Sequence, residues 1–301
     1  MQKSIEQKIL ELKKKRNAVI LSHNYQPAEV QDIADFLGDS LDLSQKAKST
    51  KHDVIVFCGV HFMAETAGML SPDKTVLLPE IASGCPMANM ATAEKLRALK
   101  AKHQGVPVVC YINTTAEVKA ECDVCCTSAN AVKIVNSIAS GKIIFVPDKN
   151  LGAYVASQTK KELILWEGYC PIHVNILEED ILRSKKEHPD AEILIHPECT
   201  PNVVKLGDKV LSTTGMCRYV TESKIKEFII GTEIGIIHRM KKENPCKIFY
   251  PASKLAVCPN MKKNSLEKVL WALEDMKYKI EVPKDISEKA VKCIDKMLKI
   301  V

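Results

Sequence analysis

The chain has 301 residues, of which 46% are hydrophobic and 5% aromatic, and its 43 lysines and arginines against 37 acidic residues give a net charge of +6. No uninterrupted apolar segment approaches the roughly 20 residues that a membrane-spanning helix needs. The charges are scattered and aromatic residues for base stacking are few, which argues against a nucleic-acid surface. A mild positive charge instead favours a small anionic substrate.

The first 16 residues lack the apolar core of a secretory signal. They have the pattern of an amphipathic helix whose N-terminus is capped by Ser4 and Gln7. We therefore expect a cytoplasmic protein. In a cytoplasmic chain of this length, twelve cysteines indicate buried thiols or metal ligands rather than disulfides.

Short runs rich in valine, isoleucine and leucine alternate with helical stretches along the chain. Strands are predicted at residues 19–25, 54–57, 108–113, 143–146, 193–198 and 228–230, and helices at stretches such as 27–36, 40–49 and 93–102. This alternation is typical of the α/β class with parallel sheets. In such folds the functional groups gather beyond the C-terminal ends of the strands.

Three Cys-Pro dipeptides follow strand-like runs at nearly equal intervals. Cys85, Cys170 and Cys258 lie 85 and then 88 residues apart, and the strand pattern repeats with them. We predict three pseudo-threefold-related α/β/α domains, each with a short parallel sheet, around a central site. The predicted units are residues 1–87, 88–172 and 173–263, with the C-terminal helices of residues 264–301 packing back on the first unit.

Polar residues recur at equivalent positions of the three repeats. One position, at the strand ends, is occupied by His23, Tyr111 and His196; the next by Tyr25, Asn113 and Glu198; and a later one by Ser40, Ser128 and Thr213, with Ser212 beside the last. These residues and His173 form a candidate site, with Glu198 as general base and Tyr111 or a histidine as proton donor or oxyanion partner. The hydroxyl residues precede helical stretches, so we expect them to cap helices and to bind phosphate or carboxylates.

The three Cys-Pro loops are candidate metal ligands. Proline biases the preceding cysteine away from helix, and a threefold arrangement would bring three thiolates to one centre. Sulfur ligands select zinc or an iron-sulfur cluster. A four-iron cluster held by three cysteines keeps one iron open as a Lewis acid, whereas a structural zinc ion would take His173 as its fourth ligand.

The remaining motifs indicate no chemistry of their own. Cys122, Cys125 and Cys126 form a CxxCC string without a second CxxC to complete a metal site, so we interpret them as structural. Cys58, Cys110 and Cys293 fit core positions of strands and a helix. The glycines of residues 231–235 do not match a dinucleotide fingerprint.

The assembled motifs resemble those of the quinolinate synthase family over essentially the whole chain. They are HNYQ (23–26), GDS (38–40), CPMAN (85–89), TSANA (127–131), HPEC (196–199), GTEIG (231–235) and NMKKN (260–264). The resemblance implies a [4Fe-4S] cluster and the condensation of iminoaspartate with dihydroxyacetone phosphate to quinolinate, the precursor of the NAD ring. It also makes the enzyme that supplies iminoaspartate a candidate partner.

The resemblance assigns roles position by position. Cys85, Cys170 and Cys258 match the cluster ligands, and Tyr25 matches a catalytic tyrosine. The matches to substrate-contacting positions are His23, Ser40, Tyr111, Asn113, Ser128, His173, His196, Glu198, Ser212 and Thr213. Some relatives carry a CxxCxxC string near the C-terminus, but here Cys258 is followed by Pro259 and Asn260, which argues against the thiol-based redox control of those relatives.

Two alternatives remain open at this point. The radical enzyme of diphthamide synthesis also resembles a three-domain protein with three cysteines around a cluster, although the HPE and HNY motifs argue against it. A zinc-stabilised metabolite-binding protein would close its metal shell with Cys85, Cys170, Cys258 and His173.

Overall fold

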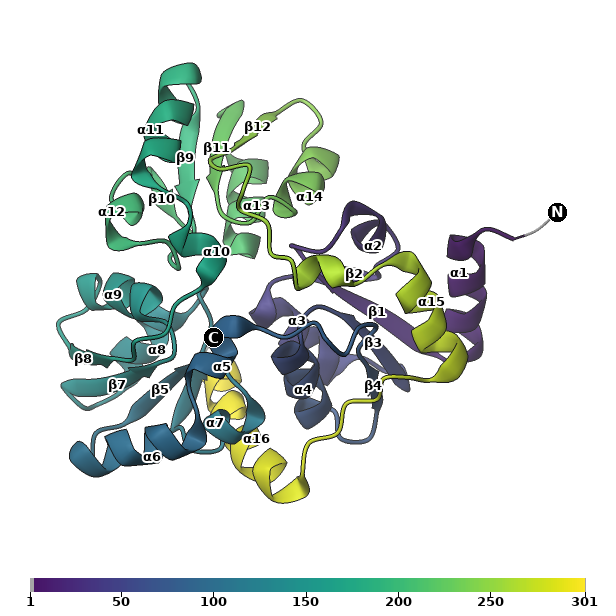
Figure 1. Cartoon of the computed structure of the whole chain (residues 1–301), viewed down its shortest axis with the longest axis horizontal. Coiled ribbons are helices and arrows are strands. Elements are labelled where there is room, and N and C mark those ends of the chain that lie inside the picture. The colour runs from purple at the N-terminus through teal and green to yellow at the C-terminus, as the bar shows by residue number, and fades with distance from the viewer. Residues whose placement is uncertain (1–2, 301) are drawn as a thin grey trace.

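The structure is a computed structural model that describes residues 3–300, and it consists of three α/β units around a common centre (Figure 1). Each unit contains one four-stranded parallel sheet, and the strand order is the same in all three. The second strand of each unit lies at one edge, followed by the first, third and fourth. The predicted α/β class with three similar domains is confirmed.

The strands of the three sheets follow one another along the chain. The first sheet contains β1 (Ala18–His23), β2 (Phe36–Gly38), β3 (Val54–Cys58) and β4 (Thr75–Leu77). The second contains β5 (Val108–Tyr111), β6 (Val124–Cys126), β7 (Lys142–Val146) and β8 (Glu162–Leu165). The third contains β9 (Glu192–Ile195), β10 (Lys209–Val210), β11 (Glu227–Gly231) and β12 (Ile248–Pro251).

Helices connect these strands and cover the sheets. In chain order they are α1 (Ile5–Lys15), α2 (Ala28–Asp32), α3 (Ser40–Ser49), α4 (His61–Leu70), α5 (Pro86–Met90), α6 (Ala93–Lys102), α7 (Ala116–Lys119) and α8 (Ala131–Ser137). They continue with α9 (Lys149–Ser157), α10 (Pro171–Val174), α11 (Glu178–Glu187), α12 (Pro201–Val204), α13 (Thr213–Glu222) and α14 (Ile236–Glu243). The 3-10 helix η1 (Met261–Lys263), α15 (Leu266–Asp275) and α16 (Lys284–Ile300) follow. Within residues 3–300, no helix combines the length and the apolar character that crossing a bilayer requires.

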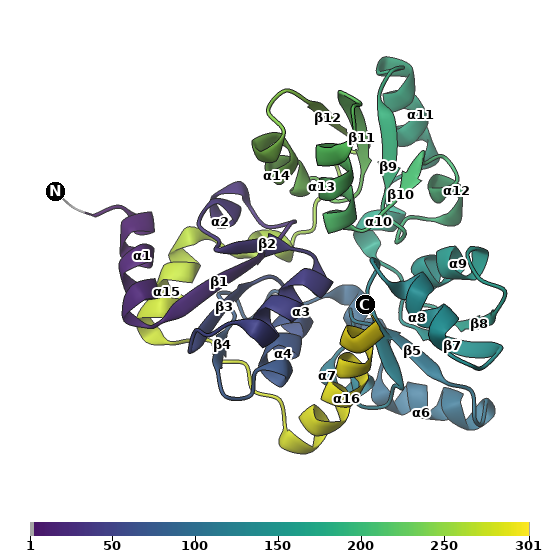
Figure 2. The ribbon, with the colours of Figure 1, turned by 180° about the vertical axis from the view of Figure 1, so that it is seen from behind.

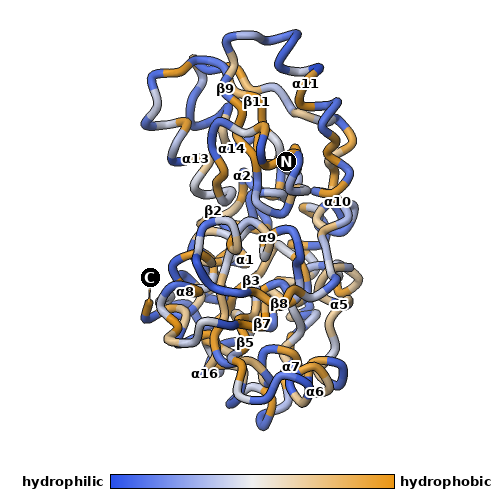
Figure 3. The backbone as a smooth tube through the Cα atoms, turned by 90° about the vertical axis from the view of Figure 1, so that its left-hand side faces the viewer, coloured by the Kyte–Doolittle hydropathy of each residue, from blue (hydrophilic) through white to orange (hydrophobic). Residues whose placement is uncertain are grey.

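The central strands are buried on both faces, which explains their nearly continuous apolar sequences. All residues of β1 and β3 are buried, and so are those of β5. Parallel strands between two helical layers have no solvent-facing side, so polar residues are excluded from alternate positions. The hydropathy colouring follows this arrangement, with hydrophobic residues along the inner strands and hydrophilic residues on many outer loops (Figure 3).

The helix caps agree only partly with the sequence-based expectation. Ser4 and Gln7 form the predicted capping box of α1. Ser40, Ser128 and Thr213 are not N-caps, because the caps of α3, α8 and α13 are Asp39, Asn130 and Ser212. A carboxylate or hydroxyl one residue earlier caps α3 and α13, which leaves Ser40 and Thr213 at the first helical position.

The two C-terminal helices take different places. We predicted that both pack on the first unit. Helix α15 lies against α1 and β3 of that unit, whereas α16 contacts α4 of the first unit and α7, α8 and β6 of the second. Figures 1 and 2 show α16 between these two units. The domain boundaries after residues 87, 172 and 263 stay a prediction.

We predict that Ile294 contributes strongly to this junction, because it is fully buried on α16. Replacing it with alanine should lower the free energy of unfolding by about 2–5 kcal/mol, from lost transfer energy and the cavity left behind. Urea unfolding measures the effect. Exposed Lys296 on the same helix provides the control, since Lys296→Ala should shift stability by no more than about 0.5 kcal/mol. Equal midpoints for the two variants would contradict the prediction.

Candidate active site at the centre of the three units

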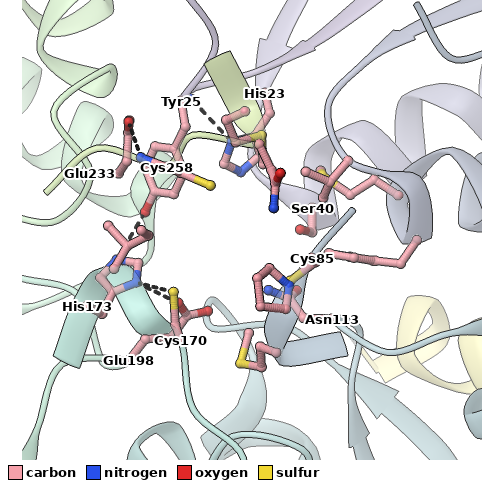
Figure 4. A pocket seen from close by; sticks show the side chains of 18 of the residues that line it. His23, Tyr25, Ser40, Cys85, Asn113, Cys170, His173, Glu198, Glu233 and Cys258 are labelled. Atoms are coloured by element: carbon pink, nitrogen blue, oxygen red, sulfur yellow. Dashed lines mark hydrogen bonds and ion pairs between the residues drawn. The ribbon is translucent and has the colours of Figure 1, made fainter. Parts of the chain in front are cut away.

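The C-terminal ends of the strands point toward the centre of the molecule, where residues of all three units line a cavity of about 170 Å³ (Figure 4). Of the predicted site residues, thirteen line this cavity: His23, Tyr25, Ser40, Cys85, Tyr111, Asn113, Ser128, Cys170, His173, His196, Glu198, Thr213 and Cys258. Ser212 does not line it. Its hydroxyl instead donates to Asp39 Oδ2 at 3.1 Å and caps α13.

The three cysteines reach the cavity in a similar manner. Cys85 and Cys170 immediately precede α5 and α10 with extended backbone conformations, and the following prolines occupy the first helical positions. Cys258 lies in the loop that leads into η1. The effect that we predicted for proline is therefore confirmed at Cys85 and Cys170. In Figure 4 all three side chains surround the same opening.

Without a cation beside them, the side chains of these three cysteines are protonated thiols at neutral pH. All three cysteines are unpaired. Burial, with a smaller contribution from negatively charged neighbours, raises the pKa of each thiol, to about 12 for Cys85. A cation among the three sulfurs would supply the positive charge that deprotonation to thiolates requires.

Distances between side-chain atoms that can bind a metal show which residues could share one ion. One ligand atom from each of Cys170, His173 and Glu198 lies within 4.8 Å of the others, and no other such group of three occurs among residues 3–300. Ligands around one tetrahedral zinc ion at about 2.3 Å are only about 4 Å apart. The three cysteine sulfurs do not form such a group.

Glu198 is a buried carboxylate between two hydrogen-bond donors. The Tyr111 hydroxyl donates to Oε1 at 2.5 Å, and His173 Nδ1 lies 2.7 Å from Oε2. Burial alone would raise the pKa of Glu198, but the adjacent His173 and the hydrogen bonds from His173 and Tyr111 outweigh it and lower the pKa to about 2. The carboxylate is thus ionised at neutral pH and connected to two side chains that can exchange protons with it.

His23 and His196 occupy equivalent positions and make the same local contact. In each, Nδ1 accepts a hydrogen bond from the backbone N–H two residues later, that of Tyr25 at 3.2 Å and that of Glu198 at 3.3 Å. Burial lowers the pKa of both imidazoles to about 3. Both rings are therefore neutral at neutral pH, and with Nδ1 accepting, their Nε2–H groups are donors toward the cavity.

Tyr25 is connected to His173 through Thr232, which the sequence did not single out. The Tyr25 hydroxyl lies 2.5 Å from Thr232 Oγ1, and His173 Nε2 lies 2.8 Å from the same oxygen. Burial, followed by the charge of Glu198, raises the pKa of Tyr25 and of Tyr111 well above the ordinary tyrosine value. Both phenols therefore keep their protons at neutral pH.

Neutral donors rather than cations surround the rest of the cavity. Among the described residues, the lining contains neither lysine nor arginine. Ser40 and Thr213 lie at the first positions of α3 and α13, and Ser128 Oγ is 3.2 Å from His196 Nε2. Asn113 Oδ1 is buried without a hydrogen-bond partner in the described structure, so a ligand with a donor group would satisfy it.

Two acidic residues of the cavity were missed by the sequence analysis. Asp39 and Glu233 both line it, and both lie inside quoted motifs, GDS and GTEIG. The signal was thus present. Their function depends on partners far along the chain, because Asp39 contacts Ser212 and Glu233 contacts Cys258 and Lys262.

Most of the other cysteines named above are buried in the core, and Cys122 is half-buried against it. Cys58, Cys110, Cys125, Cys126 and Cys293 are at most 1% exposed, and none of them lines the central cavity. Cys125 on β6 and Cys293 on α16 face each other, with their sulfurs 3.2 Å apart.

Comparison with known proteins places this chain in a family. The family model described as "Quinolinate synthetase A protein" matches residues 7–299. The quinolinate synthase of Dehalococcoides mccartyi (strain CBDB1) is 55% identical over 297 residues, covering 99% of this chain and 98% of the relative. That of Thermodesulfovibrio yellowstonii is 55% identical over 296 residues, covering 98% of each chain.

An archaeal relative is equally similar. The quinolinate synthase 1 of Methanosarcina acetivorans is 56% identical over 297 residues, which cover 99% of this chain and 98% of the relative. None of these matches supports the diphthamide-type alternative. The chain belongs to the quinolinate synthetase A family.

Proposed function

We propose that this enzyme condenses iminoaspartate with dihydroxyacetone phosphate to form quinolinate, releasing one phosphate and two waters in de novo NAD biosynthesis. The observation that carries the proposal is the meeting of three cysteine loops with the Glu198, Tyr111 and His173 cluster in one cavity. Family membership assigns the activity, and the cavity contains side chains of the kinds that the reaction requires.

The proposed cofactor is a [4Fe-4S] cluster held by Cys85, Cys170 and Cys258. Three loop cysteines that line one cavity, with sulfurs not grouped as closely as the ligands of a single ion, support a polynuclear centre. When bound, such a cluster supplies a Lewis-acidic iron that lacks a protein ligand. His173 Nδ1, which binds Glu198, also lies 3.1 Å from Cys170 Sγ and would orient a neighbouring cluster ligand.

Proton transfers fall to the residues around Glu198. A carboxylate at 2.5 Å from the Tyr111 hydroxyl can take a proton from the substrate while the phenol donates one to a departing or developing oxygen. His196 and Tyr25 provide further donors, since both hold their protons at neutral pH. The carbon acids and carbonyl groups of the two substrates need such donors and acceptors at each dehydration.

Substrate anions would be bound by hydroxyl, amide and imidazole donors. Ser40, Ser128, Thr213 and Asn113 lie around the cavity with the N-termini of α3 and α13 beside them. Helix N-termini and neutral donors bind phosphate and carboxylates without a fixed cation. His23 extends this set through its Nε2–H.

The cluster assignment predicts a composition. Protein purified without oxygen should be brown and contain about four iron and four sulfide per chain. Cys170→Ser should lose both the cluster and quinolinate formation. The exposed Cys246 offers a matched control, and Cys246→Ser should behave like the parent protein. A colourless parent protein containing zinc, or full turnover by Cys170→Ser, would refute the assignment.

The role of Glu198 predicts a different outcome. Glu198→Gln should keep the iron and sulfide content but lower kcat at least about 100-fold, because the amide cannot accept the proton. Anaerobic assay of quinolinate formation with both substrates measures the effect. Glu222→Gln, an exposed change at the end of α13, should leave the rate unchanged. An undiminished rate in Glu198→Gln would remove it as the general base.

The raised pKa of Asp39 leads to a prediction about how ligand affinity depends on pH. Burial, followed by the neighbouring Asp42, raises the pKa of Asp39 to about 6. The side chain is neutral below this pH and negative above it, so the affinity for quinolinate should decrease about tenfold from pH 5.5 to 7.5, equivalent to about 1.4 kcal/mol of repulsion. Asp39→Asn, which retains an N-cap, should remove most of this dependence in calorimetric titrations. An equal pH slope in both proteins would contradict the prediction.

A further inference from the structure

We propose that Glu233 and Lys262 are positioning residues that fix the Cys258 loop, so that its sulfur lies ready to hold the cluster. The inference rests on the proposed cluster, and it concerns two residues outside the predicted ligand and substrate set. It is carried by the hydrogen bonds and the ion pair that connect the loop after β11, the loop before η1 and the loop after β1.

Glu233 is a fully buried carboxylate whose oxygens are occupied by this chain rather than by solvent. Oε1 accepts the backbone N–H of Cys258 at 3.0 Å, and Oε2 accepts the N–H of Gly235 at 2.7 Å. A charged acceptor strengthens such bonds, and a buried carboxylate is retained only when its partners satisfy it. Glu233 therefore connects the main chain of a proposed cluster ligand directly to the end of the third sheet.

Lys262 provides the opposite charge and extends the connection to the first unit. Its Nζ lies 2.9 Å from Glu233 Oε1 and also donates to the backbone oxygen of Tyr25. The backbone N–H of Lys262 donates to the Cys258 carbonyl at 3.2 Å. The Cys258 segment is thus held at both its N–H and its C=O. The Lys262 ammonium, which forms the ion pair with Glu233, also joins this segment by a hydrogen bond to the loop after β1 that bears Tyr25. Figure 4 shows Glu233, Cys258 and Tyr25 along the same side of the cavity.

Gly235 shows how closely this cluster is packed. A Cβ atom at residue 235 would lie 2.5 Å from Lys262 Nζ, 2.8 Å from Glu233 Oε2 and 2.8 Å from the Tyr25 oxygen. These distances are shorter than any real contact of a Cβ atom, so a side chain there would displace the lysine or the carboxylate. Close packing therefore requires the second glycine of the GTEIG motif, Gly235. This packing explains the glycine in a motif that does not match a dinucleotide site.

The adjacent Thr232 extends the network to a second proposed cluster ligand. Its hydroxyl lies between Tyr25 and His173, and His173 in turn contacts Cys170. Residues 232 and 233 therefore connect Cys258 and Cys170 through polar contacts. Fixing two of the three sulfurs before the metal arrives lowers the ordering cost of cluster binding.

The first test uses protein purified without oxygen. Glu233→Ala should contain less than half of the parent's iron and sulfide and should release iron to a chelator about tenfold faster. The iron content and release rate of Glu233→Gln should lie between those of the parent and Glu233→Ala. The amide oxygen can still accept the Cys258 N–H, but it carries no charge to pair with Lys262. Lys263→Met, at the exposed neighbour of Lys262, is the control and should match the parent. Parent values for Glu233→Ala would overturn the inference.

A second measurement does not depend on the cluster. In the metal-free protein, alkylation of Cys258 by iodoacetamide, followed by mass spectrometry, should be at least about tenfold faster in Glu233→Ala, because the loop is released. Exposed Cys246 should react at the same rate in both proteins, and matching circular dichroism spectra should show that the fold is intact. Unchanged Cys258 reactivity would refute the positioning role. A parent protein without iron would instead refute the proposed cofactor, while the alkylation result still decides the inference.

Discussion

The central cavity depends on one constraint, which is that parallel strands place all their C-terminal ends at the same edge of a sheet. With three sheets of identical strand order, three such edges meet at the centre. Residues far apart in the chain, such as Tyr111 and Glu198, can then form a hydrogen bond of 2.5 Å. No local motif of this chain could have brought together three cysteines, two neutral histidines and a buried carboxylate.

Burial determines the chemical state of these groups. Imidazoles that would titrate near neutral pH in water are kept neutral, and phenols keep their protons. Glu198 is the exception, because two donors stabilise its charge more than burial opposes it. The same low-dielectric surroundings explain why the cavity can dispense with lysine and arginine, since oriented neutral donors interact strongly with an anion where water is excluded.

The sequence predicted correctly those features that depend on local residue patterns. The inner strands appeared as long apolar runs, and the repeat brought His23, Tyr111 and His196 into equivalent positions. The edge strands β2, β4, β6, β8, β10 and β12 escaped notice because two to four residues carry little periodicity. The caps at Asp39 and Asn130 were misplaced by one or two residues, since several polar residues precede each helix.

What the sequence could not reveal were contacts between distant segments. Glu233 finds its partner 25 residues later, in a loop whose path depends on the whole third unit. Helix α16 has an apolar stripe that is consistent with packing on either of the first two units, and the structure places it against both. Such choices are settled by tertiary packing rather than by propensity.

The position of α16 makes the three interfaces between units unequal. Buried apolar residues such as Ile294 join the first unit to the second. The contacts of the third unit with the other two include polar pairs, such as Asn24 with Thr213 and His196 with Ser128, beside buried apolar residues of the same core. Because α16 contacts both the first and the second unit, a motion that separated these two units would expose its buried apolar side chains to water. Within residues 3–300, the third unit is not tied in by this helix, yet it supplies part of the wall of the reaction chamber, so a shift of that unit alone would change the shape of the chamber.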